Sequence, residues 1–254
     1  IKKMMLSGAL GCLISGMAYA DGSSPQPVKP YWQDIQVVAV NKEKPRSSFM
    51  SYADRETALT SRFEKSPYYS LLNGTWKFCF VDSYKDLPQN ITDPSVNTSS
   101  WDDITVPGNW EVQGHGVAIY TNHGYEFKPR NPQPPLLPEA NPVGVYRRDI
   151  EIPASWDNRD IYLHIGGAKS GLYVYLNGKE VGYSEDSKNP AEFLINKYLQ
   201  PGKNVLTLKI FRWSTGSYLE CQDFWRMSGI ERDVFLWSQP KASIQDFRVV
   251  STLD

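Results

Sequence analysis

The chain has 254 residues, of which 41% are hydrophobic and 22% charged, the balance of a folded globular protein rather than of a disordered one. Its 27 basic and 28 acidic residues leave a net charge of −1, which argues against the strongly basic surface that nucleic-acid binding requires. The 8 Trp and 15 Tyr favour a β-rich core, a site for the flat apolar face of a sugar, or both.

The first 20 residues have the layout of a secretory signal peptide. Lys2 and Lys3 precede an apolar run from Met4 to Met17, and Ala18-Tyr19-Ala20 places small residues at the cleavage positions. The run is short for a membrane span, which needs about 20 apolar residues. Lipid attachment at Cys12 is the weaker alternative, because it would leave a very short apolar core. We therefore expect an exported protein, periplasmic or extracellular, without a membrane span.

Residues 21–66 are expected to form an extended arm. The segment is polar and aperiodic apart from Val37–Val40, and its Pro- and Ser-containing stretches are typical of loops. Helix signals are sparse, and the best of them is a short one from Tyr52 to Phe63. We expect the arm to pack on another part of the protein.

Strand patterns dominate residues 67–240. Apolar residues recur at every second position, which places them on one face of a strand. Asn177-Gly178 separates two such runs and is the strongest short-range signal of a hairpin, because both residues tolerate positive φ. The main runs are Trp76–Phe80, Tyr146–Ile150, Ile161–Ile165, Leu172–Leu176, Val205–Phe211 and Val234–Trp237. No βαβ alternation and no Gly-rich nucleotide loop occurs, so the sequence predicts an antiparallel β-sandwich of the jelly-roll type.

The strand pattern breaks at Gln239-Pro240-Lys241, and a new alternating run extends from Ile244 to Leu253. We interpret residues 241–254 as the first strand of a further domain. A single strand without a partner cannot satisfy its own backbone groups. Together with Ile rather than Met at position 1, this run leads us to expect a sequence that is part of a longer reading frame.

Several motifs resemble a known family. They are Val106–Glu111, Ile119–Asn122, Glu139–Tyr146, Tyr175–Ser187 and the long run Phe211–Val234. Together they resemble the N-terminal sugar-binding domain of the large β-galactosidases of glycoside hydrolase family 2. The long run, combined with Tyr120-Thr121-Asn122, is more similar to the galactosidases of that family than to its glucuronidases or mannosidases.

The resemblance implies a domain order and an activity. A galactose-binding-like jelly roll would be followed by an immunoglobulin-like domain, which residues 241–254 would open, and then by a TIM barrel. The full-length enzyme would hydrolyse terminal non-reducing β-D-galactose residues with retention, through two glutamates on the barrel. Neither glutamate, nor the magnesium site of the barrel, would lie in this chain. The chain would therefore contain no catalytic residue, and in isolation it would be inactive. The full-length protein would be a homo-oligomer.

The resemblance also implies that Asn122 and Asp223 contact the β-galactoside substrate, and that Asp223 helps to bind a sodium ion beside the galactose. A sugar hydroxyl both donates and accepts, so an amide and a carboxylate can hold it in one orientation. From the residues alone, the favoured interpretation of Asn122 is a turn residue before His123-Gly124. From the residues alone, the favoured interpretation of Asp223 is a structural ion pair with Arg226 or Arg232.

Other residues carry weaker signals. Glu220 and Glu231 are interpreted as structural or solvated, His164 as simply exposed, and Cys79 and Cys221 as unrelated thiols. No CxxC or HExxH motif supports a zinc site. Because a jelly roll alone does not decide function, a free-standing carbohydrate-binding module without catalytic activity remains the alternative to the enzyme.

Overall fold

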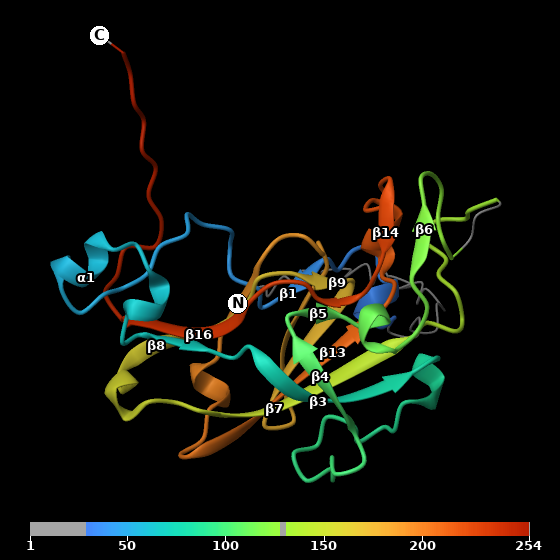
Figure 1. Cartoon of the computed structure of the whole chain (residues 1–254), viewed down its shortest axis with the longest axis horizontal. Coiled ribbons are helices and arrows are strands. Elements are labelled where there is room, and N and C mark those ends of the chain that lie inside the picture. Colours follow the sequence, from blue (N-terminus) through green and yellow to red (C-terminus); the bar gives the residue numbers. More distant parts are fainter. Residues whose placement is uncertain (1–28, 128–130, 254) are drawn as a thin grey trace, which may run out of the picture.

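The computed structural model describes residues 29–127 and 131–253, and these fold almost entirely into β-strands (Figure 1). The signal-peptide prediction falls on residues 1–20, which lie outside the described residues. Across the two described ranges, no helix has the length and apolar character needed to cross a membrane.

The larger layer of the sandwich is an antiparallel sheet in the order β1-β11-β10-β13-β7-β3-β4. Its outer strand β1 belongs to the arm, so the arm extends this sheet. The strands β3, β7, β10 and β13 follow predicted runs, whereas β4 was not predicted. The strands are β1 (Ala39–Val40), β11 (Lys179–Ser184), β10 (Gly171–Leu176), β13 (Lys203–Phe211), β7 (Val143–Glu151), β3 (Gly74–Val81) and β4 (Asp102–Val106).

The second layer is an antiparallel sheet in the order β12-β8-β16-β2. Its strands are β12 (Ala191–Leu194), β8 (Arg159–Ile165), β16 (Val234–Pro240) and β2 (Tyr69–Leu71). One core cluster contains buried residues of both layers, among them Leu208 of β13 and Leu163 of β8, which are at most 1% exposed. The all-β sandwich predicted from the sequence is therefore confirmed.

Local sequence explains the hairpin that joins β10 to β11. Leu172, Val174 and Leu176 alternate into the core, and the turn that follows needs two residues with positive φ. Asn177 and Gly178 have φ values of 53° and 77°, and the side chain of Asn177 also accepts a hydrogen bond from the backbone of Val205. The turn is thereby fixed to the neighbouring strand β13.

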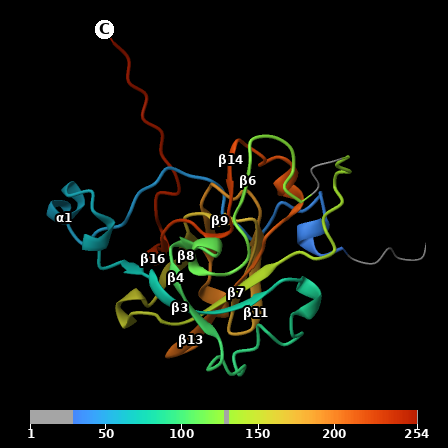
Figure 2. The same cartoon turned by 45° about the vertical axis from the view of Figure 1, so that its right-hand side comes forward.

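Two small sheets lie at one end of the sandwich. β6 (Ile119–Thr121) pairs with β14 (Phe224–Arg226), and these strands project together from the body in both views (Figures 1 and 2). The other sheet has the order β5-β15-β9, with bounds Gly108–Asn109, Gly229–Ile230 and Ala168–Lys169. These strands of two or three residues are too short to show a period, and the sequence did not reveal them.

The arm packs on the sandwich of its own chain. Trp32, in the 3-10 helix η1 (Tyr31–Gln33), is 1% exposed, and Phe211 of β13 stacks on it with ring centroids 5.0 Å apart. The predicted helix is reduced to α1 (Arg55–Leu59), which Asp54 caps by accepting a hydrogen bond from the backbone of Thr57. The remaining short helices are η2 (Phe63–Lys65), η3 (Tyr84–Asp86), η4 (Glu111–Gln113), η5 (Ala154–Trp156), η6 (Asn196–Tyr198) and η7 (Thr215–Tyr218).

The residues after β16 do not form the strand that their alternation predicted. Residues 241–253 are exposed, belong to no strand, and run away from the sandwich (Figures 1 and 2). The physical reason is the lack of a neighbouring strand: an alternating pattern becomes a strand only when its backbone groups find partners.

Candidate functional site

The paired strands β6 and β14, which we call the ribbon, place Asn122 and Asp223 at the same end of one pair. The register pairs Tyr120 with Trp225 and Thr121 with Phe224, so Asn122 directly follows β6 and Asp223 directly precedes β14. The backbone N–H of Phe224 donates to the carbonyl oxygen of Gln222, so Asp223 lies in a tight turn outside the strand. Both side chains are exposed, which leaves them accessible to a ligand.

The carboxylate of Asp223 is oriented by Tyr120. The phenol of Tyr120 donates a hydrogen bond of 2.7 Å to Oδ1 of Asp223. This hydrogen bond and the adjacent negative charge raise the pKa of Tyr120, because both disfavour the phenolate. The Tyr120 ring also contacts Trp225 edge-on at a centroid distance of 5.7 Å, and each of these two rings is more than half exposed. An acid and two aromatic rings therefore share one accessible face of the ribbon.

The structure does not give Asp223 the ion pairs that the sequence left open. Arg226 is 1% exposed and its Nε lies 3.6 Å from Oε2 of the buried Glu126. Arg232 donates instead to the backbone oxygens of Gly166 and Lys188. Among the described residues, Asp223 forms an ion pair with neither arginine, and its side-chain partner is the phenol of Tyr120.

Asn122 lies in the exposed turn after β6. Its Oδ1 shares a hydrogen bond of 2.7 Å with Nδ1 of His123, and the hydroxyl of Thr121 donates to the backbone oxygen of His123 at 2.6 Å. Gly124 follows with φ of 75°, a conformation that glycine adopts without strain. The turn role considered from the sequence is thus real, and it presents the Asn122 side chain at the tip of the ribbon.

Buried ion pairs anchor the base of the ribbon, and they were not predicted from the sequence. Trp213 donates its indole N–H to Glu126 at 3.0 Å, next to the Arg226 pair. Arg212 donates to the backbone oxygen of Val117 at 2.8 Å and lies 3.6 Å from Glu111. Since a buried charge is tolerated only when it is paired, these contacts fix where β6 and β14 emerge from the sandwich. The partners are separated by about 90 to 100 positions in sequence, so no local pattern signals them.

The two glutamates that could suggest a glycosidase pair have structural partners. Glu220 accepts hydrogen bonds from the backbone N–H and the hydroxyl of Ser187 at 2.8 and 2.6 Å. Glu231 binds the ammonium of Lys188 at 2.6 Å. Both therefore hold loops together, as the sequence reading expected.

Within the described residues, no group of three or more His, Cys, Asp or Glu side chains is placed to hold a metal ion. Asp223 offers one anionic oxygen ligand at the ribbon, which suits a hard monovalent cation but is not a complete site by itself. Cys79 and Cys221 are free thiols, in agreement with the expectation of two unrelated cysteines.

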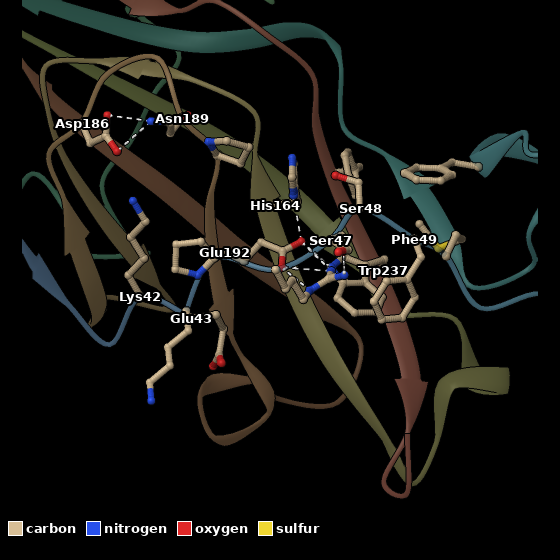
Figure 3. Close-up of a pocket in the computed structure, with 17 residues that line it drawn as sticks. Lys42, Glu43, Ser47, Ser48, Phe49, His164, Asp186, Asn189, Glu192 and Trp237 are labelled. Atoms are coloured by element: carbon tan, nitrogen blue, oxygen red, sulfur yellow. Dashed lines mark hydrogen bonds and ion pairs between the residues drawn. The ribbon is translucent and has the colours of Figure 1, made fainter. Parts of the chain in front are cut away.

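A cavity of about 390 Å³ lies away from the ribbon, between the arm and the second layer (Figure 3). Its central group is the carboxylate of Glu192, which accepts from Arg46, from the ring of His164 at 2.8 Å and from the indole of Trp237 at 3.0 Å. The prediction that His164 is simply exposed is wrong. Its side chain is 18% exposed and stacks on Phe235, because the arm covers this face of β8.

The comparisons with known proteins identify the family. The family model described as "Glycosyl hydrolases family 2, sugar binding domain" matches residues 69–240. This range contains the whole ribbon and every strand of the two sandwich layers except β1. The chain belongs to glycosyl hydrolase family 2. The resemblance seen in the motifs is confirmed.

Curated relatives of this family 2 domain are named beta-galactosidases. The protein from Priestia megaterium is 41% identical over 228 residues, which cover 89% of this chain and 22% of the relative. That from Psychromonas ingrahamii is 39% identical over 223 residues, covering 88% of this chain and 21% of the relative. The chain thus spans about a fifth of the length of these relatives.

Two solved beta-glucuronidase structures share the fold. The crystal structure of the Bacteroides uniformis beta-glucuronidase matches with a TM-score of 0.51 at 25% identity, covering 68% of this chain and 18% of that one. A related structure of beta-glucuronidase 2 from the same organism, covalently bound to a cyclophellitol-6-carboxylate aziridine, also matches with a TM-score of 0.51 and 25% identity.

Proposed function

We propose that this chain is the N-terminal, substrate-contacting part of an exported β-galactosidase that removes terminal non-reducing β-D-galactose with retention of configuration. The catalytic glutamates and the magnesium site belong, in this proposal, to a TIM barrel outside the 254 residues. The chain itself contributes binding rather than bond cleavage.

Two observations together support the proposal: the geometry of the ribbon, and the fact that the curated relatives are named beta-galactosidases. Asn122 and Asp223 directly flank the paired strands β6 and β14 at one end of the sandwich, although the register there joins segments about 100 positions apart. The relatives that match most of this chain are beta-galactosidases, whereas the cited glucuronidases match it at lower identity. A sugar-binding domain that presents an amide and a carboxylate suits a neutral galactoside.

In this proposal the Asp223 carboxylate and the Asn122 amide hold galactose hydroxyls, each hydroxyl acting as donor to one group and acceptor from another. Asp223 would also supply one ligand to a sodium ion whose remaining ligands come from elsewhere in the enzyme. Such an ion would bring positive charge to the sugar hydroxyl. Tyr120 acts as a positioning residue, since its phenol fixes the orientation of the carboxylate.

Export and assembly are parts of the same proposal. The Lys2-Lys3 segment and the apolar run after it support secretion to the periplasm or beyond. Assembly into a homo-oligomer is proposed for the full-length protein on the family resemblance alone.

The test uses the complete reading frame that contains this chain. The purified product is expected to hydrolyse an aryl β-D-galactoside at least a hundredfold faster than the matching aryl β-D-glucuronide. NMR of the first product should show the β-anomer of galactose. The 254-residue chain alone should give no hydrolysis above blank. A preference for the glucuronide, or an α-anomer as first product, would contradict the proposal.

A further inference from the structure

A second cavity, of about 560 Å³, opens on the outer face of the seven-stranded sheet. It lies between η1 of the arm, the η3 region and strands β10 and β13. Tyr173 and Tyr175 reach it because they alternate with Leu172, Val174 and Leu176, which point into the core. Neither Asn122 nor Asp223 lines this cleft, so it is separate from the ribbon.

Three tyrosine rings form one wall of the cleft. Tyr31 stacks on Tyr173 with centroids 5.7 Å apart and an angle of 9° between the planes. Tyr173 and Tyr175 lie 6.5 Å apart at 12°. The three rings are nearly parallel and stacked, and Tyr31 and Tyr175 are only partly buried, whereas Tyr173 is 5% exposed. We call this side of the cleft the tyrosine wall, and the ring surface that Tyr31 and Tyr175 leave exposed suits a ligand with an apolar face, as a pyranose ring presents through its C–H groups.

Lys209 brings to the cleft a polar donor without a hydrogen-bond acceptor among the described residues. The ammonium of Lys209 lies 4.8 Å from the centroid of the Tyr173 ring and 5.3 Å from that of Tyr175. Within the described residues it makes no hydrogen bond or ion pair, although an ammonium has three N–H groups to donate. Burial lowers the pKa of Lys209, and the nearby charge of Glu180 opposes this effect.

Glu180 supplies the complementary acceptor. Its carboxylate accepts a hydrogen bond of 3.3 Å from the phenol of Tyr175 and is itself exposed at the edge of the cleft. Two cations, Lys209 and the exposed Lys29, and one anion therefore line the same cleft. A hydroxyl can accept from Lys209 and donate to Glu180, whereas an anionic ligand would meet the carboxylate and a cationic one the ammonium.

We propose that this cleft is a second saccharide-binding site, which takes a neutral pyranoside by stacking on the tyrosine wall and hydrogen bonding to Lys209 and Glu180. The site would hold a sugar chain on the outer face of the sheet while the ribbon serves the reacting residue. The proposal does not depend on the activity proposed above, because it rests on a different face and on different residues.

The test is affinity electrophoresis of the 254-residue chain in native gels that contain soluble β-1,4-galactan or hydroxyethylcellulose. We expect at least one of these neutral polysaccharides to retard the wild type. Lys209→Met keeps the apolar stem and removes the donor, and it should weaken the apparent affinity about tenfold, as should Tyr175→Ala. Glu180→Gln alters an exposed residue and should weaken binding with the fold retained. The circular dichroism spectrum and the midpoint of thermal unfolding verify folding of each variant.

A matched control separates this site from unspecific effects. Glu151→Gln, at an exposed glutamate on β7, should leave retardation unchanged. The proposal is overturned if neither neutral polysaccharide retards the wild type, as when another segment of the chain fills the cleft. It is also overturned if only an anionic polymer such as polygalacturonate binds, or if retardation is lost in Asp223→Asn but kept in folded Lys209→Met and Glu180→Gln.

Discussion

Tyr120 and Asp223 are 103 positions apart in sequence, yet the phenol of Tyr120 donates a 2.7 Å hydrogen bond to Oδ1 of Asp223 across strands β6 and β14. The contact leaves the carboxylate accessible while restricting its orientation. A carboxylate that must hold a sugar hydroxyl benefits from such restriction, because less rotational freedom is lost when the ligand binds.

The first prediction concerns the ionisation of Tyr120. Its pKa is raised by the hydrogen bond to Asp223 and by the charge of that carboxylate. Asp223→Asn removes the charge, so the pKa of Tyr120 should fall towards 10.0, the ordinary value for tyrosine. Titration of tyrosine labelled with ¹³C at Cζ, with Tyr120→Phe to assign the resonance, measures the change. An unaltered titration curve in Asp223→Asn would show that the two groups do not interact in solution.

The second prediction concerns catalysis by the complete enzyme. Asp223→Asn should lower kcat/KM for an aryl β-galactoside about tenfold or more, since a hydrogen bond to a charged group is lost in the transition state. Tyr120→Phe should lower it by a smaller factor, because the carboxylate remains but is less restricted. Steady-state kinetics of the purified variants gives both values.

Asp102→Asn provides the matched control, since Asp102 is an exposed aspartate on β4 within the main sandwich. It should keep the wild-type kinetics. Because Asp223 is also exposed and forms no ion pair with Arg226 or Arg232, its replacement should leave the melting temperature within about 1 °C of the wild type. A variant that unfolds, or one with unchanged kinetics, would return Asp223 to a purely structural role.

The sandwich could be predicted from the sequence because its long strands carry the signal locally. In β3, Trp76 and Phe78 alternate with exposed or half-buried neighbours, and the Asn177-Gly178 turn fixes the hairpin between β10 and β11. The ribbon could not be predicted in this way, because three-residue strands show no period. Its position depends on buried pairs such as Arg226 with Glu126, which only the folded chain brings together.

The residues of the candidate site could likewise be predicted only in part from the sequence. Asn122 and Asp223 were predicted as site residues from the resemblance of motifs to a known family, because no local sequence pattern indicates that their segments pair. Tyr120 stood inside one of those motifs, but nothing in the sequence connects its phenol to Asp223. The exposure expected for His164 failed for a related reason: strand alternation places the ring on the outer face of β8, but it does not say that the arm covers that face.

The third prediction is a pH dependence of stability that originates at Glu192. Burial alone would raise the pKa of this carboxyl, but the hydrogen bond from His164 and the charge of Arg46 outweigh it, and the net pKa lies below 4.5. The unfolded chain therefore takes up a proton on Glu192 before the folded chain does as the pH falls. Stability from this group is complete above about pH 5 and is lost as the pH falls through the folded pKa.

Glu192→Gln should remove part of that pH dependence. At pH 7 the variant should be less stable by about 1.5–3 kcal/mol, the contribution of hydrogen bonds to a charged group. Between pH 5 and pH 3.5 its melting temperature should fall less steeply than that of the wild type. Glu151→Gln, at an exposed position, serves as control. Parallel curves for wild type and Glu192→Gln would contradict the assignment.

The fourth prediction tests how the arm is held. A Cβ atom at Gly182 of β11 would lie 2.3 Å from the backbone oxygen of Val40 and 2.7 Å from the Phe193 ring, so Gly182→Ala must displace strand β1. Overpacking of this kind costs about 1–3 kcal/mol. We expect a lower melting temperature and faster tryptic cleavage after Lys42, which follows the displaced strand. Val38→Ala, at a side chain that is 64% exposed, should leave the cleavage rate unchanged. Equal protection in Gly182→Ala and wild type would mean that β1 does not pair with β11 in solution.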